Sequence, residues 1–257
     1  MSIIKNNKNY GTRVKILQPE PVPLTSTYFY VEDVSGSDNT LTITRQSWSP
    51  MTIEVFASID GVNWTSMGTT NVDAPLTNTI PANGKLYLKA NTTQWGSGWD
   101  SGTVINASDY FKVGGNVMSL LNGDNFVNSG FAPNTRNIFD SLFRGCHTLI
   151  NASELQLPAT TLVESCYGRM FYGCNQLIAA PVLPATTLVR GCYGEMFHSC
   201  SSLKKIVAYA NDISAMDCTG NWLVDVSATG DFYNLGGASY TRNESGIPTG
   251  WTEHTSL

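Results

Sequence analysis

The stretch LPATTLVESCYGRMFYGC (Leu157–Cys174) returns as LPATTLVRGCYGEMFHSC (Leu183–Cys200). A phenylalanine stands three residues before a cysteine in three places, and a leucine follows each of these cysteines by three residues: Phe143, Phe171 and Phe197; Cys146, Cys174 and Cys200; Leu149, Leu177 and Leu203. A second cysteine series recurs every 26 residues, at Cys166, Cys192 and Cys218. Self-similarity at this period predicts units that stack on one another, because one unit cannot bury its own apolar face.

Within a unit, the apolar residues are spaced by four. Leu188, Cys192, Met196 and Cys200 would form one stripe of an α-helix. The helix would begin near Pro184, since proline suits a first turn. Leu203, Ile206 and Ala208 would follow as a short strand. The spacing therefore predicts a helix and then a strand in every repeat.

The phrases F-x-x-C-x-x-L, LPATTL and CYxxMFxxC resemble the BspA-like leucine-rich repeats of bacterial surface proteins, especially those of gut Bacteroidales. The ending SATGDFYNLGG…SGIPTGWT is similar to the closing stretch of such arrays, so the resemblance covers roughly residues 115–252. It implies a right-handed leucine-rich solenoid used for adhesion or recognition and not for catalysis. The chain departs from long members in having about three units, and the preceding domain is expected to cap one end.

Residues 27–113 have the signals of a small antiparallel, Ig-like β-sandwich. The segments YFYVEDV, TLTITRQ, MTIEVFASI and KLYLKAN are rich in β-branched and aromatic residues and are separated by turn residues. Asp60-Gly61 predicts a tight hairpin to the Val62–Trp64 segment, and Asn83-Gly84 a second turn. Val55, Ile59, Leu86 and Leu88 are expected to face the core. The predicted fold class is α+β, mainly β, with this sandwich followed by a leucine-rich-repeat domain and C-terminal cap at 114–257.

Trp95 and Trp99 lie in the loop NTTQWGSGWDSGT between the two predicted domains. Two interpretations are open. The indoles either stack on a sugar or a protein partner, or they cover the seam between the domains.

The six cysteines predict packing and not chemistry. Helical spacing would keep Cys192 and Cys200 too far apart for a disulfide, and there is no C-x-x-C for zinc. Cys200 and His198 would point to different sides of a helix, which argues against a nucleophile. Buried thiols are expected, with no catalytic residue, metal or cofactor; a glycosidase-like pair of carboxylates assembled in space is the remaining enzyme hypothesis.

The composition restricts the class of partner. The chain has a net charge of −5 and 14% charged residues, which argues against nucleic acid, and no apolar run approaches the ~20 residues of a membrane helix. Residues 1–26 instead form a basic, proline-containing arm with a net charge of +3, carried by Lys5, Lys8, Arg13 and Lys15 against Glu20.

Two settings suit an adhesion module that shows no export signal. The first is a phage virion (a head fibre, capsid decoration or tail component), assembled in the bacterial cytoplasm and anchored to other virion proteins through residues 1–26. The alternative is a bacterial cell-surface adhesin whose leader is missing. In either, the ligand would be a host-surface glycan, mucus or protein, and the chain would be a monomer or a homo-oligomer. The residues expected to face the ligand are those that vary between repeats: Glu164, Arg169, Arg190 and Glu195.

Overall fold

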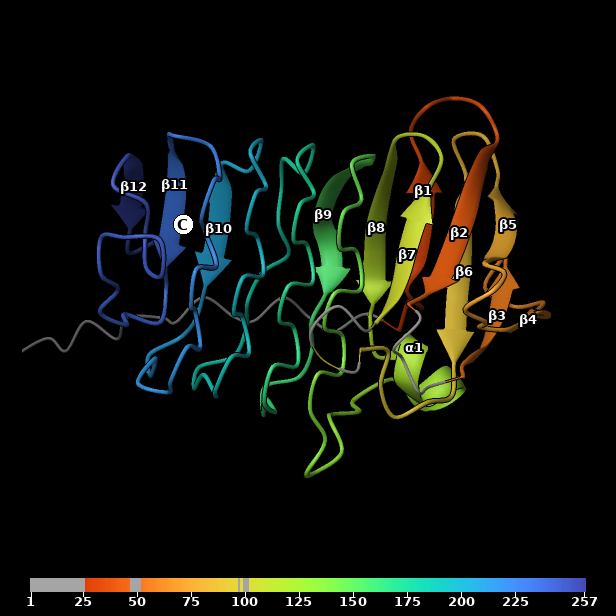
Figure 1. Cartoon of the computed structure of the whole chain (residues 1–257), viewed down its shortest axis with the longest axis horizontal. Coiled ribbons are helices and arrows are strands. Elements are labelled where there is room, and N and C mark those ends of the chain that lie inside the picture. The colour runs from red at the N-terminus through yellow and green to blue at the C-terminus, as the bar shows by residue number, and fades with distance from the viewer. Residues whose placement is uncertain (1–25, 47–51, 97, 99–101) are drawn as a thin grey trace, which may run out of the picture.

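The computed structural model describes residues 26–46, 52–96, 98 and 102–257 (Figure 1). Lys5, Lys8, Arg13, Lys15 and Trp99 therefore lie outside the described residues. The described part is mainly β, as predicted, with a single short α-helix. Its elements are β1 Tyr30–Asp33, β2 Asn39–Arg45, β3 Glu54–Ser58, β4 Thr65–Thr69, β5 Leu76–Ile80, β6 Lys85–Ala90, β7 Thr103–Ala107, β8 Phe111–Asn116, α1 Ser119–Asn122, the 3₁₀ turn η1 Gly123–Asn125, β9 Leu149–Gln156, β10 Lys205–Ala208, β11 Gly230–Asn234 and β12 Trp251–His254.

The N-terminal half consists of two sheets. The larger has the order β4-β3-β6-β1-β8-β9 and the smaller the order β5-β2-β7. Both are antiparallel except for the β8–β9 pair. In β2, Leu41 and Ile43 are fully buried, while the alternate threonines point outward, because side chains alternate between the faces of a strand.

The predicted hairpin and core are confirmed except at one position. β3 and β4 pair antiparallel, and Gly61 in the connection has φ +72°. Val55, Leu86 and Leu88 are buried, but Ile59 is 69% exposed, so its assignment to the core was wrong. The register of β3 shifts at a bulge after Val55 and the strand ends at Ser58, so the two-residue alternation does not extend to Ile59.

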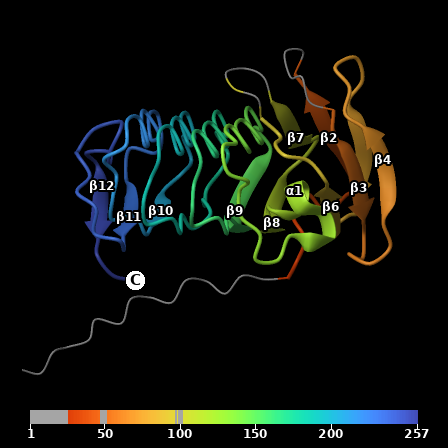
Figure 2. The ribbon, with the colours of Figure 1, turned by 90° about the horizontal axis from the view of Figure 1, so that it is seen from below.

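The two predicted domains share one sheet and one core. β8 of the sandwich pairs in parallel with β9 of the repeat region, so the predicted boundary between residues 113 and 114 falls inside a strand. On the other layer, the free edge of β7 meets the first repeat, where Ile105 N donates to Leu142 O at 2.8 Å. Figure 2 shows the smaller sheet on the side of the turns and the larger sheet on the side of the strands. The sandwich therefore occupies the position of a preceding repeat.

The predicted helix over Pro184–Cys200 is wrong. Residues 190–199, like their counterparts in the other repeats, form a run of tight turns, and residues 184–189 before them are extended and irregular. The backbone N–H groups of the turns alternate between bonds within the segment and bonds to the next repeat: Met196 N donates to Tyr193 O at 3.1 Å, and Phe197 N to Trp222 O at 3.0 Å. An α-helix would keep these bonds within one segment.

A period of four, rather than 3.6, explains why these turns resemble a helix in the sequence. Every fourth residue has a positive φ, and the series extends to a fourth repeat: Asn137, Ser141, Gly145; Ser165, Arg169, Gly173; Gly191, Glu195, Ser199; and Asp217, Asn221, Asp225. A residue with a positive φ takes the backbone off the right-handed helical path, so the i→i−4 hydrogen bonds of an α-helix do not form. Apolar residues four apart then face the same core, as they would on a helix.

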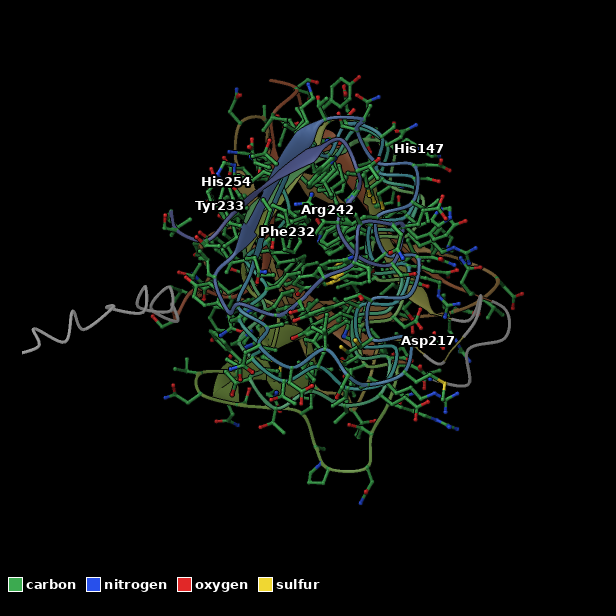
Figure 3. The ribbon with its side chains drawn as sticks, turned by 90° about the vertical axis from the view of Figure 1, so that its left-hand side faces the viewer. His147, Asp217, Phe232, Tyr233, Arg242 and His254 are labelled. Atoms are coloured by element: carbon green, nitrogen blue, oxygen red, sulfur yellow. The ribbon has the colours of Figure 1, made fainter. Side chains whose placement is uncertain are left out.

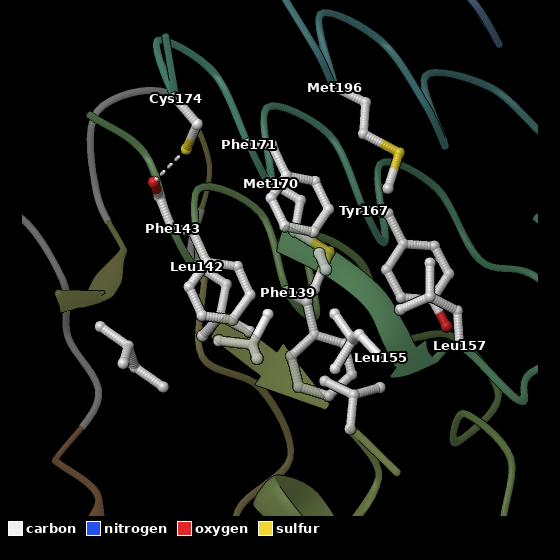
Figure 4. Close-up of a cluster of buried hydrophobic side chains, with 14 of the residues drawn as sticks. Phe139, Leu142, Phe143, Leu155, Leu157, Tyr167, Met170, Phe171, Cys174 and Met196 are labelled. Carbon is white, nitrogen blue, oxygen red and sulfur yellow. Dashed lines mark hydrogen bonds between the residues drawn. The ribbon is translucent and has the colours of Figure 1, made fainter. Parts of the chain in front are cut away.

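The core between the turns and the strands contains ladders of aromatic rings, part of which Figure 4 shows. Phe171 lies 5.4 Å from Phe143 and 5.4 Å from Phe197, with nearly parallel rings. A second ladder runs through Phe139, Tyr167, Tyr193 and Trp222 to Tyr240. Each repeat thus buries its rings against its neighbours.

The strand side continues from β9 to β12 through the middle repeat. Parallel bridges join Asn151 to Ala179 and Leu183 to Ala208. Pro181 and Pro184 keep this middle segment from forming a full strand, because proline has no N–H to donate. β10, β11 and β12 then pair in parallel, which confirms the predicted strand after Leu203. Beyond β11, Tyr240 stacks on Trp222 and Ile247 is fully buried. The C-terminal cap stays a prediction.

Candidate binding surface

Trp95 is not on the surface. Its side chain is fully buried, and its indole Nε1 donates to Leu120 O at 2.7 Å. Its backbone N donates to Ile138 O at 2.7 Å, which ties the loop to the first repeat. The sugar-stacking interpretation is therefore wrong for Trp95, and the seam interpretation is confirmed.

Arg169 also lies inside, contrary to the prediction that it faces a ligand. Its guanidinium Nη2 is 2.7 Å from Asp140 Oδ2, and Nε donates to Asp140 Oδ1 at 3.2 Å. Asp140 also accepts from Ser141 Oγ at 2.8 Å. Burial raises the pKa of Asp140, and the guanidinium of Arg169 opposes that rise. The difference between repeats at this position reflects a buried ion pair and not recognition.

Glu164 and Arg190 do face outward, on neighbouring repeats. Their side chains are 45% and 64% exposed, and Arg190 Nη1 lies 3.5 Å from Glu164 Oε1. Glu195 is half-buried, with φ +53°. Of the four repeat positions chosen from the sequence, two are thus exposed, and those two pair with each other.

The cysteines are all buried and free, as predicted. The thiols of the Phe-x-x-Cys series donate to carbonyl groups of the preceding layer: Cys146 to Ile105 O at 2.9 Å, Cys174 to Phe143 O at 3.0 Å (Figure 4) and Cys200 to Phe171 O at 3.1 Å. Burial raises the pKa of Cys200 well above its usual value. His198 contacts Ser199 and Tyr172 on the surface, so it does not activate this thiol.

A row of side chains that the sequence did not single out lies on the turn surface. It consists of Arg144, Tyr172 and His198, which occupy the same position in successive repeats. The rings of Tyr172 and His198 are 4.6 Å apart and nearly parallel, and the guanidinium carbon of Arg144 lies 5.3 Å from the centre of the Tyr172 ring. His198 Nδ1 is 2.9 Å from Ser199 Oγ, which orients the imidazole. The sequence marks these three residues only as the second, variable position of the phrases FRGC, FYGC and FHSC.

Arg144 also borders an open groove of about 310 Å³ where the smaller sheet meets the first repeat. We call this the Arg144 groove; it is lined by Thr42, Thr44, Gln46, Val104, Asn106, Ala107, Ser108 and Arg144. The lining carries hydroxyl, amide and guanidinium groups. No carboxylate is among these residues. The groove is therefore suited to a polar ligand.

The groove is built on fixed backbone. Thr42 and Asn106 are direct cross-strand partners of β2 and β7. Asn106 Oδ1 accepts from Thr148 Oγ1 at 3.4 Å, and Ser108 Oγ donates to Asn39 Oδ1 at 2.9 Å. These bonds hold two of the polar side chains in place before any ligand arrives, which lowers the entropy cost of binding.

A second polar cluster lies on the strand side near the C-terminus. His254 Nε2 is 2.7 Å from Asp231 Oδ1, its ring stacks on Tyr233 at 4.7 Å, and Lys205 Nζ lies 4.7 Å from the same tyrosine ring. Figure 3 shows His254 and Tyr233 together, on another side of the molecule from His147 and Asp217. These groups partner one another across β10, β11 and β12.

Within the residues that the structure describes, no three His, Cys, Asp or Glu side chains gather in a way that would hold a metal ion. None of the described helices has the length and apolar character needed to cross a bilayer. The chain matches no protein-family model, no curated protein and no solved structure.

Proposed function

We propose that this chain is a non-enzymatic recognition protein in which an Ig-like sandwich continues into a short BspA-like leucine-rich-repeat solenoid. The stacked turns, the parallel strands and the recurring Phe-x-x-Cys-x-x-Leu phrase support the repeat assignment. The sandwich starts the stack and also contributes β2 and β7 to the Arg144 groove. In this proposal, the protein adheres to a glycan or mucus on a host surface.

The Arg144 groove is the observation that carries the proposal. Sugars present many hydroxyl groups, and binding them requires several preplaced donors and acceptors. Four residues of the lining, Thr42, Thr44, Asn106 and Ser108, offer such groups side by side. Cleaving a glycosidic bond requires a pair of carboxylates, and among the described residues that line the groove the polar groups are hydroxyls, amides and a guanidinium. In this proposal the groove binds a glycan and does not cleave it.

The cysteines favour the phage virion over the cell surface as the setting. Free thiols that donate hydrogen bonds within the core suit a protein that folds in a reducing compartment such as the bacterial cytoplasm, where virions assemble. In the virion, residues 1–26 with Lys5, Lys8, Arg13 and Lys15 would attach the chain to capsid or tail proteins. The alternative remains a BspA-like adhesin of the bacterial surface.

A glycan array tests the recognition function. The full chain is compared with the double variant Thr42→Val, Thr44→Val, which removes two hydroxyl groups and keeps the β-branched shape. We expect the variant to lose its array signals while Thr79→Val, exposed on β5, keeps them. An array without signal for the unmodified chain would contradict the function.

Deletion of residues 1–26 tests the setting. Incorporation into phage particles should be lost while the melting transition of residues 27–257 is retained. Unchanged incorporation would reject the anchoring role of the arm.

A further inference from the structure

We propose that the Arg144 groove binds a straight, β-1,4-linked glycan that lies across the strands of the smaller sheet, along Thr77, Thr42 and Asn106. This inference rests on the proposed function, because it names the kind of glycan and the direction in which it lies. It follows from the spacing of the three side chains, from the polar groups that they leave unpaired, and from the position of β2 in the sheet.

Three side chains of the smaller sheet form a row across its strands, which we call the Thr42 row. Thr42 of β2 is the direct antiparallel partner of Thr77 on β5 and of Asn106 on β7. Direct partners have Cβ atoms about 5 Å apart, so the row places a polar side chain at three successive steps. Thr42 and Asn106 line the groove, and the exposed Thr77 continues the row beyond it. A straight glycan repeats its hydroxyl groups at a similar step, the length of one sugar residue.

The Thr42 row has polar groups that remain for a ligand. Asn106 Oδ1 accepts from Ala107 N at 2.8 Å and from Thr148 Oγ1 at 3.4 Å, which orients the amide and leaves its Nδ2 group as a donor. Within the part of the chain that the structure describes, the hydroxyl groups of Thr42 and Thr77 form no hydrogen bond. A hydroxyl group can both donate and accept. Each step of the row therefore offers a donor to a sugar oxygen.

The neighbouring row on the same face is less suited to the ligand. It consists of Thr79, Thr40 and Ser108. Ser108 Oγ donates to Asn39 Oδ1 at 2.9 Å and accepts from Thr40 N at 3.1 Å, so its proton is already used within the protein. Thr40 and Thr79 are exposed partners of one another but do not line the groove. Thr79 therefore provides a control position on the same strand and face as Thr77.

Two other ligand classes fit the groove less well. An extended peptide binds a sheet by pairing with the backbone of an edge strand, whereas β2 is the central strand, between β5 and β7. A ligand over Thr42 would thus be recognised through side chains. An anion would require the guanidinium of Arg144, which already contacts the ring of Tyr172 and interacts with the carboxylate of Asp140.

The test uses cellobiose, cellotriose, cellotetraose and cellohexaose, each titrated into the full chain and followed by NMR chemical shifts. The length of the Thr42 row predicts that affinity rises from cellobiose to cellotriose by roughly 3- to 10-fold, the effect of one added neutral hydrogen bond. Affinity should change little from cellotetraose to cellohexaose. Maltotriose has the same sugars in an α-1,4-linked chain that coils, and it should bind more weakly than cellotriose. Equal affinity for cellobiose and cellotriose, or a preference for maltotriose, would overturn the inference.

Matched variants locate the glycan on the sheet. Thr77→Val removes the hydroxyl group at the end of the Thr42 row and keeps the β-branched shape. It should remove the advantage of cellotriose over cellobiose and leave the affinity for cellobiose unchanged. Thr79→Val makes the same change one row away on β5 and should leave both affinities unchanged. If Thr79→Val weakens cellotriose as much as Thr77→Val does, the assigned direction is wrong. Thermal melts confirm that both variants are folded.

The outcomes distinguish this inference from the function on which it rests. If the cellobiose series does not bind, the assignment of a straight β-1,4-linked glycan is overturned. The recognition function then stands if the glycan array gives other signals that the double variant Thr42→Val, Thr44→Val abolishes. An array without any signal removes both.

Discussion

The carboxylate of Asp140 and the guanidinium of Arg169 form a buried ion pair that joins the first and second repeats, with Nη2 and Oδ2 2.7 Å apart. The side chains are 1% and 7% exposed, so neither charge is solvated by water. The residues at the position of Asp140 in the next two repeats are Gly168 and Gly194, so this ion pair is formed once in the stack.

Removing Arg169 is expected to be strongly destabilising. Arg169→Met leaves the Asp140 carboxylate buried without its counter-charge, which costs about 3–5 kcal/mol in the free energy of unfolding. Urea denaturation at pH 7 measures it. Asp140→Asn combined with Arg169→Met should recover much of the loss, whereas Arg190→Met, from an exposed pair, should cost under about 1 kcal/mol.

The loss of stability caused by Arg169→Met should depend on pH in a defined direction. Burial raises the pKa of Asp140 in the folded protein, and the variant lacks Arg169, the cation that opposes this rise most. A folded-state pKa above the unfolded value favours folding at low pH and disfavours it as pH rises. The deficit of Arg169→Met should therefore shrink as pH falls toward about 4. A deficit that grows with acidity would contradict this account.

Glu195 is a site where a substitution should stabilise the protein. Its φ of +53° is a left-handed conformation that glycine adopts without the steric cost borne by other residues. Glu195→Gly is expected to raise the free energy of unfolding by roughly 0.5–1 kcal/mol. Glu164→Gly, outside the positive-φ series, should lower it by a similar amount. A loss at both positions would mean that the turn geometry is wrong.

Asp33 should make the sandwich sensitive to acid. Burial alone would raise the pKa of this carboxyl, but hydrogen bonds from Ser35, Asn83 and Gly36 outweigh it and lower the pKa from 3.8 to about 2. The lowered pKa of Asp33 stabilises the folded protein by roughly 2 kcal/mol at pH values above the pKa of this carboxyl in the unfolded chain. The stabilisation is lost as the pH falls through the pKa of Asp33 in the folded protein.

Asp33→Asn should flatten the loss of stability between about pH 4 and pH 2, as followed by the urea midpoint at several pH values. Asp38→Asn is the control, since Asp38 is exposed and accepts a single backbone bond from Ala82. If both variants titrate like the unmodified chain, Asp33 is not the group responsible.

The cysteines should be unreactive in the folded protein. Burial raises the pKa of Cys192 to about 12 and that of Cys146 and Cys166 well above the usual value, so thiolate is scarce at neutral pH. A thiol reagent should label few of the six cysteines under native conditions and all six in denaturant. Rapid native labelling of most of them would contradict the packing.

The sequence predicted the stacking of the repeats better than their local structure. A recurring Phe-x-x-Cys requires only that each unit place the same residues in the core, which both turns and helices achieve. Over one short segment, the spacing of apolar residues does not distinguish turns with a period of four residues from an α-helix with a period of 3.6. Glycine and asparagine stand at some of the positive-φ positions, such as Gly145, Gly173 and Asn221, but Ser165, Arg169 and Glu195 also have positive φ angles. Residue type therefore signalled the turns at only part of these positions.

The candidate site was harder to predict because its residues come from distant segments. Thr42, Asn106 and Arg144 meet only because β7 lies against the first repeat. Trp95 and Trp99 were candidates for ligand stacking because of their large rings, but Trp95 is buried between the sandwich and the first repeat. Variation between repeats pointed to the surface in the case of Glu164 and Arg190, but at Arg169 it marked a buried partner for Asp140.

The placement of β7 and β8 against the first repeat makes the length of this protein adjustable. The described residues that line the groove all lie in the sandwich and the first repeat, so they do not depend on how many repeats follow. Duplicating one 26-residue unit would move the ends apart by about 5 Å, the spacing of adjacent strands, and would leave both chemically unchanged. The number of stacked units therefore sets the distance between the two ends.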